Sequence, residues 1–200
     1  MHMLFVTLLY FFYLLIYTNF AIAETNTDVT ATVTAYEHRN YEATLRRLRP
    51  LAKSGDADAQ YNLANMYRNG RGIQADHAEA LKWYHKAGEQ GDARAQNILG
   101  FIYKYGDGVT RCNTEAVRWW REAAEQGNAN SQANLADMYR TGRGVTRDAT
   151  EAVRWWRKAA EQGDADAQIN LGLMYDEGEG VPEDDKEAMK WYRRAAGESS

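Results

Sequence analysis

Side chains that could act as nucleophiles, general bases or metal ligands are few in this sequence and lie far apart. Beyond residue 23 the histidines are His38, His77 and His85, and no His-Glu-x-x-His, Gly-x-Ser-x-Gly or Cys-x-x-Cys motif accompanies them. His77 and His85 are eight residues apart, a spacing too loose to indicate a shared metal ion. We therefore predict that the protein is not an enzyme and has no catalytic residue, no metal and no cofactor.

The acidic segment 176–185 contains carboxylates of the kind that bind calcium. It lacks the alternating ligand spacing of a calcium-binding loop, so we interpret it as a solvated linker. The whole chain has a net charge of −4, and residues 163–200 contain four basic and ten acidic residues. Because no segment has the clustered lysines and arginines that nucleic acid requires, we predict that the chain does not bind nucleic acid.

The aromatic residues follow a 36-residue period. The pairs Trp119-Trp120 and Trp155-Trp156 are flanked at this interval by Trp83-Tyr84 and Trp191-Tyr192, and four glycines share it: Gly55, Gly91, Gly127 and Gly163. Such a period indicates a stacked solenoid. We assign the repeats to residues 55–90, 91–126, 127–162 and 163–198. A solenoid presents an elongated surface, which favours a binding protein.

Each repeat is predicted to contain two helices, which makes the fold class all-α. In the first helix, Ala59, Leu63 and Met66 have the spacing of a core-facing stripe, and Gly70 ends the helix. The second helix begins with an Asp-x-x-Glu signature, seen at Asp76, Asp148 and Asp184. We predict that both the aspartate and the glutamate cap this helix. The aromatic pairs are predicted to fill the core.

Cys112 is the single cysteine and stands where the other repeats have the capping aspartate. An unpaired cysteine in an exported protein indicates an intermolecular disulfide or a free reactive thiol. The alternative is that Asn113 or Thr114 caps the helix and Cys112 has no role.

Residues 24–54 match the repeats less well, and we interpret them as an N-terminal capping unit. Leu45, Leu48, Leu51 and Ala52 resemble a second helix, and residues 30–39 could supply a first one. Pro50 lies inside the expected helix, where it predicts a kink or an early end.

The pattern Gly-Asp-Ala-x-Ala-Gln-x-x-Leu-x-x-Met-Tyr-x-x-Gly-x-Gly-Val, followed by Glu-Ala-x-x-Trp-x-x-x-Ala-Ala-Glu-Gln, resembles the Sel-one-like repeat (SLR) family of tetratricopeptide-type solenoids. The resemblance implies a right-handed α/α superhelical solenoid of helix-turn-helix repeats. It also implies an exported adaptor that binds a protein or peptide on a concave face lined by the first helices. A cysteine-rich branch of the family is linked to β-lactam binding or hydrolysis, which makes a cell-envelope hydrolase the alternative. That branch has paired cysteines, whereas this chain has one.

The positions of the first helices that change between repeats are predicted to bind the partner, because they resemble the ligand-facing positions of tetratricopeptide helices. The candidate residues are Tyr61, Asn62, Asn65, Arg68, Asn97, Ile98, Phe101, Lys104, Tyr105, Asn134, Asp137, Arg140 and Asn170. We expect the amides of Asn62, Asn134 and Asn170 to clamp a peptide backbone, since an amide both donates and accepts hydrogen bonds. Phe101 and Tyr105 are expected to be exposed, and the alternative is a solvated groove.

The two ends of the chain carry further expectations. Residues 1–23 contain no charged side chain and end in Ala21-Ile22-Ala23, which predicts a cleaved signal peptide and a periplasmic or secreted protein. The segment lacks Lys and Arg before its apolar run, so an uncleaved anchor is the alternative, and only then do we expect membrane contact.

At the other end, Trp191 and Tyr192 are expected to be uncovered, although terminal repeats normally need a polar cap. Either Lys190, Arg193 and Arg194 shield this edge or it docks a partner. We predict weak self-association through this edge.

Overall fold

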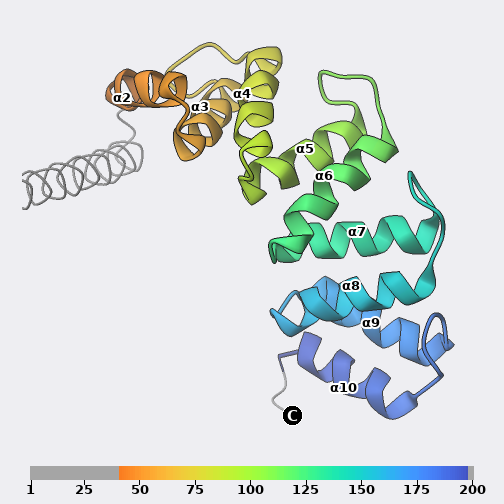
Figure 1. Cartoon of the computed structure of the whole chain (residues 1–200). Coiled ribbons are helices and arrows are strands. Elements are labelled where there is room, and N and C mark those ends of the chain that lie inside the picture. Colours follow the sequence, from red (N-terminus) through yellow and green to blue (C-terminus); the bar gives the residue numbers. More distant parts are fainter. Residues whose placement is uncertain (1–40, 198–200) are drawn as a thin grey trace, which may run out of the picture.

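The computed structural model describes residues 41–197, which contain helices joined by turns and no strand (Figure 1). The helices are α2 (Tyr41–Ser54), α3 (Ala57–Asn69), α4 (His77–Glu89), α5 (Ala93–Tyr105), α6 (Asn113–Glu125), α7 (Ala129–Thr141), α8 (Ala149–Glu161), α9 (Ala165–Glu177) and α10 (Asp185–Ala195). The predicted signal peptide and the helix expected over residues 30–39 lie outside the described residues.

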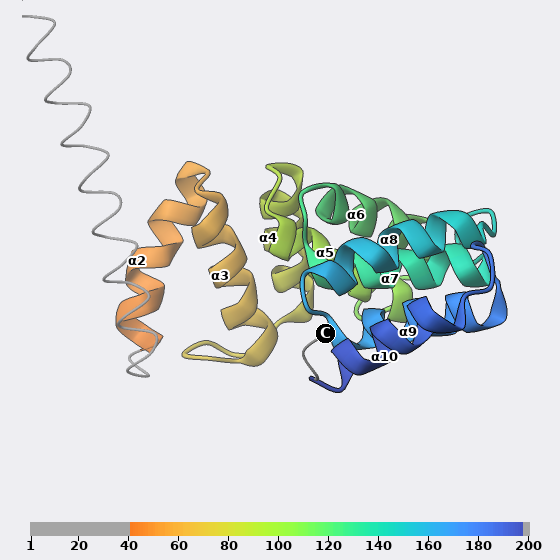
Figure 2. The same ribbon diagram turned by 90° about the horizontal axis from the view of Figure 1, so that it is seen from below.

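Each helix from α2 to α10 packs against the next one along the chain. The pairs α3/α4, α5/α6, α7/α8 and α9/α10 follow one another as a stack, seen from two sides in Figures 1 and 2. This arrangement confirms the predicted all-α solenoid of helix-turn-helix repeats. Within residues 41–197, no helix is both long enough and apolar enough to cross a lipid bilayer.

The second helices are capped by their aspartates, but the predicted role of the glutamates is wrong. A side-chain oxygen of Asp76 accepts a hydrogen bond from the amide of Glu79 at 2.9 Å. The amide of Asp76 donates to the carbonyl of Tyr67, so it needs no glutamate. Glu79 instead forms an ion pair with Lys82 at 2.9 Å and accepts a hydrogen bond from Trp83 Nε1.

The predicted end of the first helix is confirmed at Gly70, whose φ of 65° lies in the left-handed region that glycine adopts without strain. The expected early end at Pro50 is not found, because α2 continues to Ser54. Cys112 occupies the N-cap position of α6 without a side-chain capping bond. Asn113 does not replace it, because its buried Oδ1 has no hydrogen-bond partner among the described residues.

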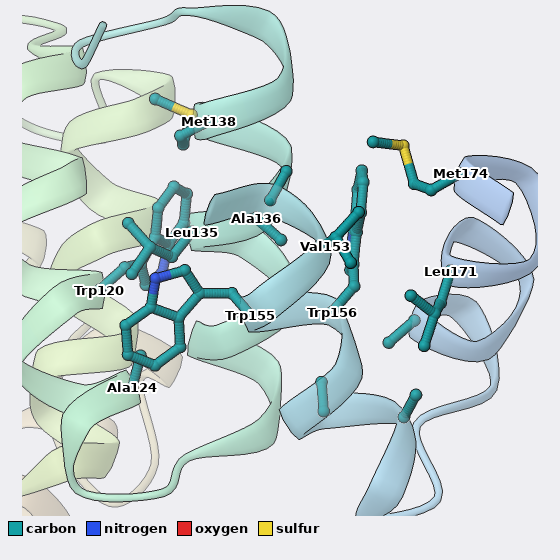
Figure 3. Close-up of a cluster of buried hydrophobic side chains, with 14 of the residues drawn as sticks. Trp120, Ala124, Leu135, Ala136, Met138, Val153, Trp155, Trp156, Leu171 and Met174 are labelled. Carbon is teal, nitrogen blue, oxygen red and sulfur yellow. The ribbon is translucent and has the colours of Figure 1, made fainter. Parts of the chain in front are cut away.

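The two members of each aromatic pair pack against different helices. The first member lies over the preceding repeat, as Figure 3 shows for Trp155, whose ring extends toward Ala124 of α6. The second member lies against the first helix of its own repeat. Trp120 approaches Gly100 so closely that a Cβ atom on this glycine would lie 2.3 Å from Trp120 Nε1. One aromatic pair thus joins two repeats, and its burial stabilises the whole stack.

A buried glutamine also links neighbouring repeats. Gln132 is 3% exposed, and its Nε2 donates to the carbonyl of Ala124 at 3.1 Å across the repeat boundary. Equivalent bonds are made by Gln60, Gln96 and Gln168. The glutamine is part of the repeat pattern, but its position in the sequence alone did not reveal this role.

Candidate functional site

A hollow of about 440 Å³ opens among α5, α7, α8 and the start of α9. The lining residues are Phe101, Asn130, Ala133, Asn134, Asp137, Trp156, Asp164, Asp166 and Asn170. Four of them, namely Phe101, Asn134, Asp137 and Asn170, belong to the predicted binding set. The hollow therefore brings together candidate residues from three successive repeats, and its size is typical of a ligand pocket.

The hollow lies where two repeat positions have small side chains. One position is occupied by Tyr61, Asn97, Ala133 and Ile169, and the other by Asn65, Phe101, Asp137 and Leu173. One repeat earlier, Phe101 fills the corresponding space, with its ring centre 5.3 Å from that of Trp120. Ala133 and Asp137 cannot fill the space in the same way, so the region beside Trp156 remains open.

The amide clamp of Asn62, Asn134 and Asn170 stays a prediction, and each of these amides already makes one hydrogen bond within its own helix. Each Nδ2 donates to the carbonyl four residues earlier in its own helix, at 2.9, 2.7 and 2.8 Å respectively. A polar side chain on a helix surface finds this acceptor one turn away, so one of the two N–H donors of each amide is used within its own helix. The second N–H and the side-chain oxygen of each residue remain for a partner.

Several predicted binding residues serve the scaffold instead. Asn65 Oδ1 accepts a 2.8 Å hydrogen bond from the hydroxyl of Tyr84, and Asn97 Oδ1 accepts one from a serine of α7. Tyr61 and Ile98 are partly buried against the hydrophobic core. Packing accounts for part of each of these side chains, and contact of their remaining surface with a ligand stays a prediction.

Three of the four charged residues in the predicted binding set lie close together, and the fourth, Arg68, lies apart from them. Lys104 Nζ lies 3.9 Å from a carboxylate oxygen of Asp137, and Arg140 lies 3.6 Å from the other oxygen. Asp137 is thus neutralised by two cations. Arg68 lies at the end of α3, on a different repeat.

The two aromatic residues expected to be exposed differ from each other. Tyr105 is 68% exposed, as predicted. Phe101 is only partly exposed, because its edge packs against Trp120. The Phe101 and Tyr105 rings are nearly parallel, at 3°, with centres 6.3 Å apart. Only Tyr105 is therefore a fully accessible aromatic contact.

The sequence did not reveal Ala133, Trp156, Asp164 and Asp166 as part of this site. Trp156 is 2% exposed and belongs to the core, as expected, yet it also lines the hollow. Asp164 accepts a hydrogen bond from the amide of Ala167 and caps α9, so its place in the repeat pattern indicates only a structural role. The available signal was the small side chain of Ala133 at a position where the other repeats have larger ones.

The C-terminal edge also departs from expectation. Trp191 is 5% exposed, and the guanidinium of Arg194 lies over its ring, 4.7 Å from the centre. The alternative that neighbouring basic residues shield the C-terminal edge is therefore correct for Trp191. The exposed apolar residues at this edge are Ile169, Leu173 and Met189, which are 44%, 40% and 50% exposed.

In the part of the chain that the structure describes, no group of three His, Cys, Asp or Glu side chains is arranged to hold a metal ion. His85 lies with Nε2 3.0 Å from the hydroxyl of Tyr103, and burial lowers the pKa of this histidine. Cys112 is partly buried and unpaired. His85 thus contributes to packing between α4 and α5.

The paired helices and their period define an α/α repeat protein. The Sel1 repeat model matches residues 57–92, 93–128, 129–164 and 165–199, and the chain belongs to the Sel1 repeat family. Sel1 repeat proteins commonly act as scaffolds for protein–protein interaction. No curated protein matches the chain.

Solved structures show the same fold. The chain is 34% identical to a Sel1 repeat protein from Oxalobacter formigenes, with a TM-score of 0.81, covering 84% of this chain and 69% of the other. It is 40% identical to a protective antigen of uropathogenic Escherichia coli that displays an SLR fold, with a TM-score of 0.74 and coverage of 76%. The match spans 33% of the length of that antigen.

Proposed function

We propose that this chain is an exported, non-enzymatic adaptor that binds a protein or peptide on the concave face formed by α3, α5, α7 and α9. The observation that carries the proposal is the hollow of about 440 Å³, which three successive repeats build together. A scaffold needs no such opening for stability, because interiors are otherwise closely packed.

The chemistry of this face supports a peptide rather than a small apolar ligand. Asn134 and Asn170 present side-chain oxygens at the hollow, and such acceptors match the amide groups of a peptide backbone. Tyr105 adds an exposed aromatic surface nearby in sequence to Phe101, and aromatic residues are frequent anchors at protein interfaces.

Export is supported by the apolar segment and the Ala21-Ile22-Ala23 pattern at the start of the chain. The Escherichia coli relative is a protective antigen, and an exported location would fit that likeness. Weak self-association through Ile169, Leu173 and Met189 also belongs to this proposal, because these side chains form an exposed apolar edge.

The adaptor proposal is tested by peptide-array capture with the purified protein and the variant Ala133→Tyr. The new side chain is expected to fill the hollow and to weaken capture about tenfold or more, a change of about 1.4 kcal/mol. The fold should accept it, because Tyr61 occupies the same position in the first repeat.

Glu161→Tyr is the matched control, since it adds the same side chain at an exposed position of α8 outside the hollow. Equal capture by both variants would show that the partner uses another face. Turnover of nitrocefin by the purified protein would contradict the non-enzymatic part of the proposal.

A further inference from the structure

We infer that the hollow receives the side chain of a lysine or arginine from the partner peptide, an inference that rests on the proposed peptide-binding function. The hollow has an apolar floor, which suits the stem of such a side chain, and a rim rich in oxygen acceptors, which suits its charged end. A basic side chain has an apolar stem and a cationic head that donates hydrogen bonds.

The floor is formed by Phe101, Ala133 and Trp156. Trp156 is 2% exposed, and its Nε1 is not among the fully buried indole donors that lack a partner, which are those of Trp119, Trp155 and Trp191. The equivalent Trp120 donates to the carbonyl of Asn97 at 3.2 Å. No such bond is found for Trp156 within the described residues, so its partly accessible N–H is open to an acceptor in the hollow.

One methyl group explains why Trp120 Nε1 makes this hydrogen bond and Trp156 Nε1 does not. Trp120 packs down onto Gly100, where a Cβ atom would lie only 2.3 Å from Nε1. The residue at the same position beneath Trp156 is Ala136, whose Cβ occupies that space. Trp156 is therefore held away from the acceptor that Trp120 reaches, and its N–H is left for a carbonyl of a bound peptide.

Oxygen acceptors predominate on the rim of the hollow. Asn134 and Asn170 each use one amide N–H within their own helices, which leaves the side-chain oxygen and a second N–H. Asp164 and Asp166 add two carboxylates at the start of α9, and neither is a member of the ion pairs found among the described residues. Only one oxygen of Asp164 is engaged, in the cap bond to Ala167.

The charges around the hollow favour a cationic occupant. Lys104 and Arg140 are the nearby cations; both approach Asp137, and the guanidinium of Arg140 also lies over the Trp156 ring, 5.8 Å from its centre. No lysine, arginine or histidine is among the residues that line the hollow. A carboxylate would meet Asp164 and Asp166 without a counter-charge, whereas an ammonium or guanidinium would pair with them.

The test is a titration of the purified protein with three blocked amino acids: Nα-acetyl-lysine amide, Nα-acetyl-arginine amide and the uncharged Nα-acetyl-norleucine amide. The indole N–H signal of Trp156 in a nitrogen-15 NMR spectrum reports on the hollow. It is assigned with Trp156→Tyr, a change that the scaffold accepts at Tyr84 and Tyr192. The lysine and arginine compounds should shift this signal saturably, and the norleucine compound at least about tenfold more weakly.

The matched variant is Asp164→Asn combined with Asp166→Asn. It recreates the sequence at the start of α7, where Asn128 caps the helix and Asn130 follows, so the fold is retained. Removing both carboxylates should weaken lysine binding about tenfold or more. Unchanged affinity in this variant would overturn the inference.

Equal binding of the norleucine compound would also overturn the inference. The peptide array separates this failure from failure of the adaptor proposal. Capture of peptides that Ala133→Tyr abolishes, without enrichment of lysine or arginine, would leave the adaptor proposal standing and refute the basic side chain. Absence of any captured peptide would refute both.

Discussion

The side-chain amide of Gln162 donates a 2.7 Å hydrogen bond to the side-chain oxygen of Gln132, thirty residues earlier. Gln132 uses its own amide to reach the preceding repeat at Ala124. The same pair occurs as Gln126 with Gln96, at the same distance. In these two repeats, one buried polar side chain therefore ties the repeat both to itself and to its neighbour.

Replacing Gln132 by leucine should lower the free energy of unfolding by about 1–2 kcal/mol, since two hydrogen bonds of a buried side chain are lost. Urea denaturation measures the change. Gln162→Ala is the control, because Gln162 is exposed and loses one link to the neighbouring side chain. A smaller cost for Gln132→Leu than for the control would contradict the linking role.

Trp155→Ala should lower the free energy of unfolding by about 3–5 kcal/mol, as expected for removal of a large core side chain. Trp155 is 3% exposed and packs against the preceding repeat, so the loss should extend to adjacent repeats. Hydrogen exchange shows which helices lose protection. Trp155→Phe should cost less, because it keeps a ring and removes an indole N–H that has no partner among the described residues.

His85 should make stability depend on pH. Burial lowers the pKa of His85 below its ordinary value of 6.5, which means that the folded state disfavours the charged form. The stability contribution is complete above the unfolded pKa and is lost as the pH falls through the lowered folded pKa. Urea unfolding at about pH 7.5 and about pH 5 should therefore show a larger loss for the wild type than for His85→Arg.

Arginine is the appropriate replacement because Arg121, at the same repeat position, donates to the hydroxyl of Tyr139 at 3.0 Å. Carboxylates that titrate in both proteins cancel in the comparison. The same change at the more exposed His77 serves as the control. An identical pH profile for wild type and His85→Arg would contradict the prediction.

Leu173→Glu should abolish the proposed weak self-association, since it places a charge in the exposed apolar edge that also contains Ile169 and Met189. Sedimentation velocity over a concentration series detects the association. A sedimentation coefficient of the wild-type protein that stays constant with concentration would contradict this prediction.

Cleavage after Ala23 should leave Glu24 as the first residue of the protein isolated from its native host. The Ala21-Ile22-Ala23 pattern is the reason for this expectation. Intact-mass measurement decides the point, and recovery of the uncleaved chain in the membrane fraction would instead indicate an anchor.

The fold could be predicted from the sequence because the burial pattern recurs in every repeat and each first helix ends at the same glycine. The contacts of individual polar groups could not be predicted from the sequence. Glu79 meets Lys82 and Trp83 only after the backbone of Asp76 has found another acceptor, and the pattern contains no sign of that. The amide of Asn134 is similarly used one turn away in its own helix.

The candidate site was predicted in part for the same reason. The variable positions on the first helices include Phe101 and Asp137, which line the hollow, because variation is unconstrained where a repeat faces outward. The opening itself depends on side-chain volumes in three repeats at once. No single position, including Ala133, reveals it without the geometry of its neighbours.

The hollow depends on small differences between otherwise equivalent repeats. The determining residues of the third repeat are Ala133, Ala136 and Asp137, and their counterparts in the second are Asn97, Gly100 and Phe101. Exchanging the two sets should move the opening by one unit along the array, whereas the carboxylates of Asp164 and Asp166 would stay in place. The opening can thus be repositioned by three substitutions in each of two repeats, while recognition also depends on the residues at its rim.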